Sequence, residues 1–428
     1  MSERADSTQA CGQIYPQTAV PAAGEASRPL QLHVISLAEA LDARFARGWD
    51  ESVCAAKLTP EKSRAMRENP AVARLAKGDQ EPAQVIATQD ERVVGRIDLV
   101  ASDLVVQRGM RTSVQSILWG SNLFVPPAER KSMVGAMVLM KAAVIAPTVG
   151  AHGPSQLALP LYEKLRFAAI PLERHILLQR SRSVARRYLG DGMAATAASA
   201  VGDLALLGLR GINAGRSLAS GVRIRRVPAM PSEFAEVLCN DRPDPSLGGG
   251  DPDASGDAIP TQIRGRRSIE WLNWLIGNEF GGDGESPRTR HERALFLVEN
   301  RRRTALGYLL LKVKFHRRAT AREFPDLTLA SLADWGVFDP RPEFRDQFGS
   351  ILVPMAIRAA SAASVDALEL CVAPTDPLAQ RLRSFGFLRA GVMNCMVRAN
   401  PASALSSIPY TKPTSWVLRY GEGETVLG

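Results

Sequence analysis

Cysteine is scarce in this sequence, and its cysteines follow no pattern that would build a disulfide framework or a zinc site. There are five, an odd number, and they are scattered: Cys11, Cys54, Cys239, Cys371 and Cys395. Zinc sites and secreted disulfide frameworks show short, regular spacings instead. We therefore expect no metal, and a reducing compartment, the cytoplasm, as the location of the protein.

Long apolar runs are also missing. No stretch reaches about 18 uninterrupted apolar residues, as a membrane-crossing helix requires, and the nearest candidate, residues 193–209, is rich in alanine and contains Asp203. The first thirty residues are polar and rich in proline and alanine, without the basic and then apolar pattern of a signal peptide. We therefore expect no membrane span, and a disordered tail over 1–30.

Positive charge is concentrated in one segment. The net charge is +9, and the segment from Arg174 to Arg226 contains ten arginines but only two aspartates, a balance of +8. Two interpretations stay open: the arginines between Arg180 and Arg187 contact an anionic membrane surface or a phosphorylated acceptor, or they belong to a solvated helix that pairs with the acidic loop 241–257. Few aromatic residues interleave these arginines, so we expect no specific nucleic acid as a partner.

The order of the predicted elements repeats once along the chain. In the first half we predict strands at 32–36, 84–88, 93–106, 113–125, 147–151 and 167–178, and helices at 37–48, 60–77, 129–145 and 155–165. In the second half we predict strands at 222–227, 294–299, 305–315, 326–337, 367–373 and 414–420, and helices at 232–240, 268–276, 345–362 and 377–385.

This order predicts an α+β fold made of two tandem units, each a mixed, mostly antiparallel sheet flanked by helices. The units would cover 31–180 and 221–428. Between them lies a connector rich in arginine and alanine at 181–220. A loop at 241–260 is rich in glycine, proline and aspartate, a composition that predicts flexibility.

One segment carries a specific ligand pattern. Residues 122–142, NLFVPPAERKSMVGAMVLMKA, are typical of the end of a strand, a loop with a glycine and the start of an apolar helix. The first turn of a helix has backbone N–H groups without intrahelical acceptors, and these groups bind phosphate. We therefore predict a pyrophosphate site at this loop.

The element order, with this loop after the fourth strand, resembles the GCN5-related N-acetyltransferase (GNAT) superfamily, whose loop motif R/Q-x-x-G-x-G/A binds the pyrophosphate of acyl-CoA through backbone amides. Arg130 matches the motif arginine and Gly135 its second glycine, whereas Met133 replaces the first. A methionine makes a close backbone approach harder. The resemblance implies acetyl-CoA as cosubstrate, bound by Leu123, Phe124, Val125, Arg130, Lys131, Ser132, Met133, Val134, Gly135, Ala136 and Ser155.

A second motif of that superfamily, N-x-x-A-x-x-L-Y-x-K-x-G-F, is similar to residues 155–167, SQLALPLYEKLRF. Ser155 replaces the asparagine that bonds the pantetheine arm, and Arg166 replaces the glycine. Pro160 removes a backbone donor inside the predicted helix, so we expect a local distortion. The resemblance implies that Tyr162 is the general acid that protonates the departing thiolate; the alternative is a tyrosine that packs at the start of a helix.

No general base can be identified from the pattern. In many members of the superfamily a carboxylate on the strand before the loop deprotonates the acceptor, but residues 113–125 contain no Asp or Glu. Asp98, Asp103 and His152 on neighbouring strands are candidates, and each also has a purely structural interpretation. Trp119 and Ser121 could shape the acceptor pocket, although Trp119 fits a core position equally well.

The second unit keeps the element order without the motif residues. Arg345 aligns with the motif arginine, but Phe348 and Ser350 occupy the two glycine positions and Leu382 stands where the tyrosine belongs. A bulky phenylalanine in the turn would fill the space that a phosphate needs. We therefore predict that this unit is degenerate.

Two tandem families resemble the chain as a whole. One is a set of tandem GNAT proteins of bacterial polysaccharide gene clusters, similar in GAHGPSQLALPLYEKLRF, IEWLNWL and SWVLRYGEGE. It implies an acetyl-CoA-dependent N- or O-acyltransferase with a small-molecule or glycan acceptor, such as a sugar or polysaccharide precursor. The other, the Fem peptidyltransferases, implies transfer from aminoacyl-tRNA. A third alternative is a non-catalytic binding module, because a fold does not establish activity.

Overall fold

The computed structural model describes residues 29–41, 60–75, 77–90, 92–238, 261–278, 289–316, 327–338, 342–374 and 376–420. Several sequence predictions lie outside these ranges. They are the disordered tail up to residue 28, residues 42–48 of the first predicted helix, and the flexible loop 241–260.

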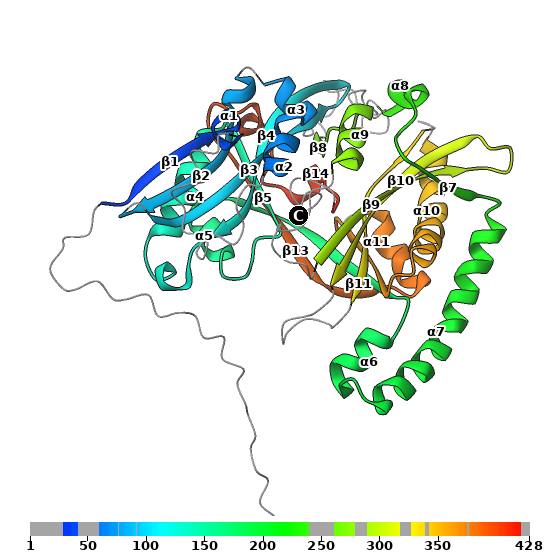
Figure 1. Ribbon diagram of the computed structural model, residues 1–428. Coiled ribbons are helices and arrows are strands. Elements are labelled where there is room, and N and C mark those ends of the chain that lie inside the picture. Colours follow the sequence, from blue (N-terminus) through cyan, green and yellow to red (C-terminus); the bar gives the residue numbers. More distant parts are fainter. Residues whose placement is uncertain are drawn as a thin grey trace, which may run out of the picture.

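The strands of both halves join in one mixed sheet (Figure 1). In spatial order its strands are β1 (Gln31–Ser36), β2 (Pro82–Gln89), β3 (Arg92–Arg108), β4 (Arg111–Phe124), β5 (Thr148–His152), β13 (Leu388–Ala399), β6 (Ala168–Leu178), β12 (Ala367–Val372), β11 (Thr328–Val337), β10 (Ala305–His316), β9 (Thr289–Glu299) and β7 (Arg223–Val227). Beside this path, β8 (Thr261–Gly265) pairs with β3 and with β14 (Trp416–Val417). Among the described strands, parallel pairing occurs only at β4–β5, β11–β12 and β8–β14. The predicted fold class, α+β with a mixed, mostly antiparallel sheet, is confirmed.

The two halves exchange strands at the centre of the sheet. β13, from the second half, lies between β5 and β6 of the first half and is antiparallel to both; Cys395, for example, lies opposite His152 on β5 and opposite Ile170 on β6. β6 in turn pairs with β12 of the second half. Each predicted unit therefore completes its sheet with a strand of the other, and the boundaries 31–180 and 221–428 stay a prediction.

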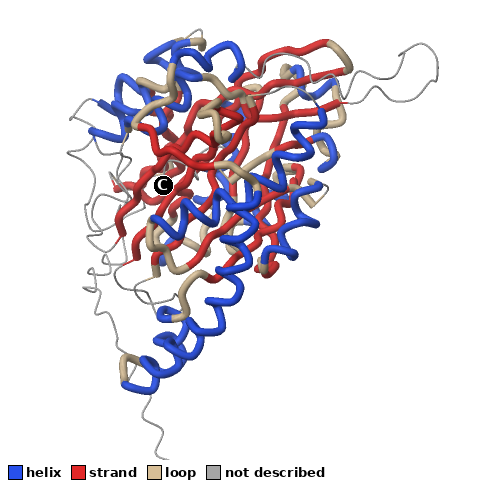
Figure 2. The backbone as a smooth tube through the Cα atoms, turned by 90° about the vertical axis from the view of Figure 1, so that its right-hand side faces the viewer, coloured by secondary structure: helices blue, strands red, loops and turns tan. Residues whose placement is uncertain are grey.

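Helices cover both faces of the sheet (Figure 2). Those of the first half are α1 (Leu37–Leu41), α2 (Pro60–Arg67), α3 (Pro70–Ala73), α4 (Val134–Ile145) and α5 (Leu159–Lys164). Those of the second half are α8 (Ala235–Leu238), α9 (Ile269–Gly277), α10 (Pro342–Ala362) and α11 (Pro377–Leu382). Between them, the predicted connector forms α6 (Arg182–Leu189) and α7 (Met193–Ala219). Short 3-10 turns lie at η1 (Gly78–Gln80), η2 (Pro127–Glu129), η3 (Ser232–Phe234), η5 (Arg383–Phe385), η6 (Ala404–Ser407) and η7 (Pro413–Ser415).

α4 packs across the first half of the sheet, and its position is fixed by a close approach to β3. Val134, Val138 and Leu139 are buried on one side of this helix, the spacing that helical periodicity requires. A Cβ atom added at Gly95 of β3 would lie only 2.5 Å from Cγ1 of Val134. The absence of a side chain at Gly95 therefore lets the first turn of α4 rest directly on the strand.

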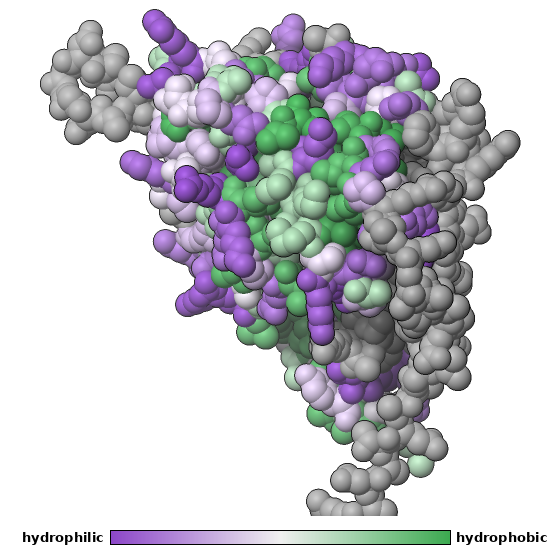
Figure 3. Space-filling model, turned by 90° about the vertical axis from the view of Figure 1, so that its left-hand side faces the viewer, coloured by the Kyte–Doolittle hydropathy of each residue, from purple (hydrophilic) through white to green (hydrophobic). Residues whose placement is uncertain are grey.

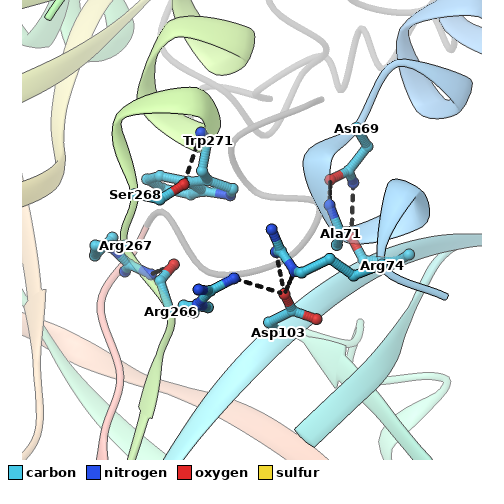
Figure 4. Close-up of polar contacts among 9 residues, drawn as sticks. Asn69, Ala71, Arg74, Asp103, Arg266, Arg267, Ser268 and Trp271 are labelled. Atoms are coloured by element: carbon cyan, nitrogen blue, oxygen red, sulfur yellow. Dashed lines mark hydrogen bonds and ion pairs between the residues drawn. The ribbon is translucent and has the colours of Figure 1, made fainter. Parts of the chain in front are cut away.

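Polar contacts connect α3 and the segment before α9 to β3 (Figure 4). Asn69 caps α3, and its amide donates to the carbonyl of Ala101 at 2.7 Å. Asp103 accepts from Arg74, which ends α3, and lies 3.8 Å from a guanidinium nitrogen of Arg266, which precedes α9. These bonds connect helices of both halves to one strand.

Several predicted elements have other bounds in the structure. The helix predicted at 60–77 is divided into α2 and α3. The helix predicted at 129–145 begins at Val134, because the 3-10 turn η2 and a bond from the Ser132 hydroxyl to the carbonyl of Glu129 precede it. The helix predicted at 155–165 begins at Leu159, and the strand predicted at 414–420 is reduced to Trp416–Val417. Serine and proline supply these early interruptions, since both favour turns over helix interiors.

Candidate functional site

The N-terminus of α4 presents free backbone donors. The amide of Val134 donates to the hydroxyl of Ser132 at 3.3 Å, and the side chain of Arg130 donates to the carbonyl of Val125 at 3.2 Å. Within the described part of the chain, the amides of Gly135 and Ala136 have no acceptor. They lie at the positive end of a 12-residue helix, the arrangement that binds an anion.

Met133, at the position of the missing glycine, adopts an ordinary backbone conformation. Its φ is −78° and its ψ is 0°, so no left-handed conformation is needed there. Its side chain is 68% exposed and points into solvent instead of filling the loop. The methionine is therefore compatible with the backbone geometry of this turn.

The end of β4, the start of α4 and α5 meet at one point. A Cβ atom at Gly135 would lie 3.3 Å from Val125 and 3.9 Å from Leu161 of α5. β4 and β5 pair only from Leu118–Val149 to Gly120–Ala151, and β4 then continues to Phe124 without β5. The two parallel strands therefore separate next to the free amides of α4.

The side of the molecule that carries α4 and α5 has an area of apolar surface bordered by polar side chains (Figure 3). Large exposed apolar residues here are Met133, Met140, Val144 and Leu157. The anion-suited start of α4 thus lies beside a partly apolar surface.

The second predicted motif forms α5 with small departures. Ser155 precedes the helix, and its hydroxyl accepts from the amide of Ala158 at 3.3 Å. Pro160 falls in the first turn, where a helix needs no backbone donor, so the expected distortion inside the helix is wrong. Tyr162 is 2% exposed, and its ring packs edge-on against Phe167 at 5.0 Å between centroids. Its role as general acid stays a prediction.

Polar side chains gather on the face of β2, β3, β4 and β5 that points away from α4. Asp98 lies opposite Gln84 on β2 and opposite Ser121 on β4, so the three share one face. The amide of Gln84 donates to Asp98 at 2.7 Å, and the amide of Asn122 donates at 3.1 Å. Asp98 is therefore an oriented carboxylate in a buried position, 1% exposed.

Several buried atoms on this face have no hydrogen bond of normal geometry in the described structure. They are Oε1 of Gln84, all three side-chain nitrogens of Arg96, Nε1 of Trp119, Oγ of Ser121 and both ring nitrogens of His152. Buried polar groups are ordinarily hydrogen-bonded, because each unpaired one costs free energy. Their concentration on one face fits a site that holds water or a polar substrate.

His152 closes this face at the end of β5. Its ring lies 6.4 Å, centroid to centroid, from Trp119 and from Tyr420, edge-on to both. Burial lowers the pKa of His152 to about 4, although a contact with the backbone of Arg419 opposes the shift. The imidazole is therefore neutral at pH 7, and the lowered pKa makes it a weaker proton acceptor than an exposed histidine.

Two of the three base candidates, Asp98 and His152, lie on the polar face. The third, Asp103, forms ion pairs with Arg74 and Arg266. Gln84, Arg96 and Tyr420 were not predicted as site residues. Strand alternation places Arg96, two residues before Asp98, on the same face. Gln84 is placed only by its register with Asp98, which single-chain patterns do not give.

The second half repeats the strand separation without the loop. β11 and β12 pair only from Leu329–Ala367 to Ser331–Glu369. Arg345 lies inside α10, whereas Arg130 precedes α4. A cavity of about 350 Å³ beside these helices is lined by Arg216, Ser350, Arg381, Ser384 and Phe385. Arg216 of α7 therefore lines this cavity together with Ser350 of α10, and the degeneracy of this unit stays a prediction.

No family model matches this sequence, and no curated protein matches it. Among solved structures, similarity extends to a GCN5-related N-acetyltransferase from Anabaena variabilis (10% identity, 87% of this chain and 73% of that chain, TM-score 0.43). It also extends to Saccharomyces cerevisiae N-myristoyltransferase with bound myristoyl-CoA (12%, 89% and 88%, 0.49) and to a tandem GNAT protein from the clavulanic acid biosynthesis pathway (12%, 88% and 100%, 0.42).

Proposed function

We propose that this protein is an acyl-CoA-dependent acyltransferase whose first half binds the cosubstrate. The observation that supports this most is the convergence of the free amides of Gly135 and Ala136 with the separation of β4 from β5. The amides would bind the pyrophosphate, and the separated strands would admit the pantetheine arm. Binding at this place would hold the thioester beside the polar face.

The polar face supplies groups for acceptor chemistry. An amine or hydroxyl of the acceptor attacks the thioester carbon, and its proton passes to Asp98 or His152, directly or through water. The backbone amides of residues 123–125 stabilise the oxyanion. The carbon–sulfur bond then breaks, and Tyr162 protonates the thiolate.

The narrower assignments rest on the sequence resemblance alone. They are acetyl-CoA as the acyl donor, and a sugar or polysaccharide precursor as the acceptor. The polar face, with a carboxylate, an arginine and a serine, fits a hydroxyl-rich acceptor.

Calorimetric titration with CoA and acetyl-CoA tests the proposal. We expect wild-type protein to bind both, and Lys131→Glu to bind about tenfold more weakly, because it places a negative charge beside the amides. Lys141→Glu, on α4 beyond its first turn, is the matched control and should bind like wild type. Absence of binding to wild type would overturn the proposal.

Two other outcomes identify the alternatives. Steeply salt-dependent tRNA binding without CoA binding would indicate an aminoacyl-tRNA-dependent transferase. CoA binding without turnover on any amine or sugar acceptor would indicate a binding module.

A further inference from the structure

α6 and α7 form an arm that extends beyond the sheet (Figure 1). α7 has 27 residues, a length of about 40 Å at the rise of an α-helix. By length and composition α7 could cross a membrane, and only 6% of its most apolar window is buried in the fold. The contacts of this helix therefore decide whether it spans a membrane or lies on one.

The polar side chains of α7 point toward the protein. Asp203 accepts from the amide of Ser181 at 2.8 Å. The amide of Asn213 donates to the carbonyl of Phe385 at 3.2 Å, and Arg216 donates to that of Ser384 at 2.6 Å. Arg210 donates to the carbonyl of Gln179. All three charged residues of α7, Asp203, Arg210 and Arg216, are therefore engaged on its inner side.

The outward side of α7 is apolar along its whole length. Its large exposed side chains are Met193 (91%), Val201 (71%), Leu204 (68%), Leu207 (54%), Ile212 (58%) and Leu218 (73%). Alanines and glycines fill the positions between them. An amphipathic helix of a soluble protein normally turns its apolar side to the core. α7 has the opposite orientation, and its outer side fits an apolar environment.

The tip of the arm is basic. Arg182 and Arg187 of α6 are exposed; Asp191 pairs with Arg186 at 3.3 Å, and Asp366 lies on the inner side of α6, where it accepts from Ser183. Tyr188 is 76% exposed and Leu189 51% exposed. Exposed arginines beside an aromatic and an aliphatic side chain are typical of helices at the interface of anionic membranes.

We propose that the α6–α7 arm binds the surface of an anionic lipid bilayer. The outer side of α7 enters the boundary between headgroups and acyl chains, and the α6 arginines contact lipid phosphates. Charge selects this partner over a second copy of the chain, since a second copy would bring another segment with a balance of +8 against the first. The bonds from Asn213 and Arg216 to the fold keep α7 flat on the surface, because a spanning helix would have to break them.

Flotation with lipid vesicles tests this proposal without any cosubstrate, so it can fail while acyl transfer stands. We expect the full chain to float with vesicles of phosphatidylcholine mixed with phosphatidylglycerol and not with phosphatidylcholine alone. Leu204→Glu and the double change Arg186→Glu/Arg187→Glu should each weaken binding at least about tenfold.

Matched controls use exposed residues elsewhere. Met110→Glu, at a position 60% exposed in the turn between β3 and β4, and Arg111→Glu should bind like wild type. Because the changed side chains on the arm are exposed or half-buried, thermal unfolding should occur near the wild-type temperature.

Four results would overturn the proposal. The first is failure of wild type to float, and the second is flotation that Leu204→Glu leaves unchanged. The third is a dimer in sedimentation without lipid that Leu204→Glu converts to a monomer, which would indicate that α7 contacts a second copy of the chain. The fourth is resistance of the bound chain to alkaline extraction, which would indicate a spanning helix.

Discussion

Arg96 and Asp98 share one face of β3 with 4.0 Å between a guanidinium nitrogen and a carboxylate oxygen, and neither reaches solvent (0% and 1%). This separation is too long for a hydrogen bond. Asp98 takes its hydrogen bonds from Gln84 and Asn122 instead, so the donors of Arg96 stay free for another acceptor. A hydroxyl or carboxylate of a bound acceptor would complete the pair.

Asp98→Asn should destabilise the fold. It removes the carboxylate charge that lies beside the buried guanidinium of Arg96, and loss of one partner from a buried pair costs about 3–5 kcal/mol. Chemical denaturation measures the change. The double variant Arg96→Met/Asp98→Asn should be markedly less destabilised than Asp98→Asn. A loss in the double variant equal to the sum of the losses in Arg96→Met and Asp98→Asn would show that the two residues are not coupled.

The free energy of unfolding should decrease as the pH is lowered, because His152 titrates. The pKa is about 4 in the folded chain and 6.5 as its ordinary value, so the unfolded chain takes up a proton between these values while the folded chain does not. The contribution is present above pH 6.5 and is lost toward pH 4, a change of about 3 kcal/mol. His152→Gln should flatten the dependence in that window and leave the slope above about pH 7 as in wild type.

Tyr162→Phe should lower turnover by about 100-fold, as expected for loss of a general acid, while CoA affinity changes little. Steady-state kinetics and calorimetry separate the two effects. Tyr308→Phe provides the control: Tyr308 is buried in the second half and donates to Asp334 at 2.7 Å, so this change should cost about 1 kcal/mol of stability and no turnover. Full turnover in Tyr162→Phe would show that the tyrosine only packs against Phe167.

Residues 1–220 should not fold alone. Without residues 221–428, β6 would lose both of its partners, β12 and β13, and β5 would become an edge, and exposed edges promote aggregation. Coexpression of 1–220 with 221–428 should restore a soluble complex in size-exclusion chromatography. A soluble, folded 1–220 fragment would instead support two independent units.

Much of the fold could be predicted from local pattern. Alternating apolar residues mark the strands, and apolar residues at helical spacing mark α4 and α10. Boundaries were less accurate where serine and proline form turns, as at Ser132 and Pro160. The exchange of β13 could not be predicted, because strand neighbours depend on contacts between residues more than two hundred positions apart, such as His152 and Cys395.

The candidate site, too, was predicted from the sequence only in part. The sequence by itself determined the loop before α4, since a helix start presents free amides whatever surrounds it. Only the tertiary structure decided that Gln84, Ser121 and His152 lie on one face with Asp98, because strand register is a property of pairing between strands. It also decided that the apolar side of α7 faces outward: helical periodicity reveals an apolar side, but only packing shows whether that side meets the core or the surroundings.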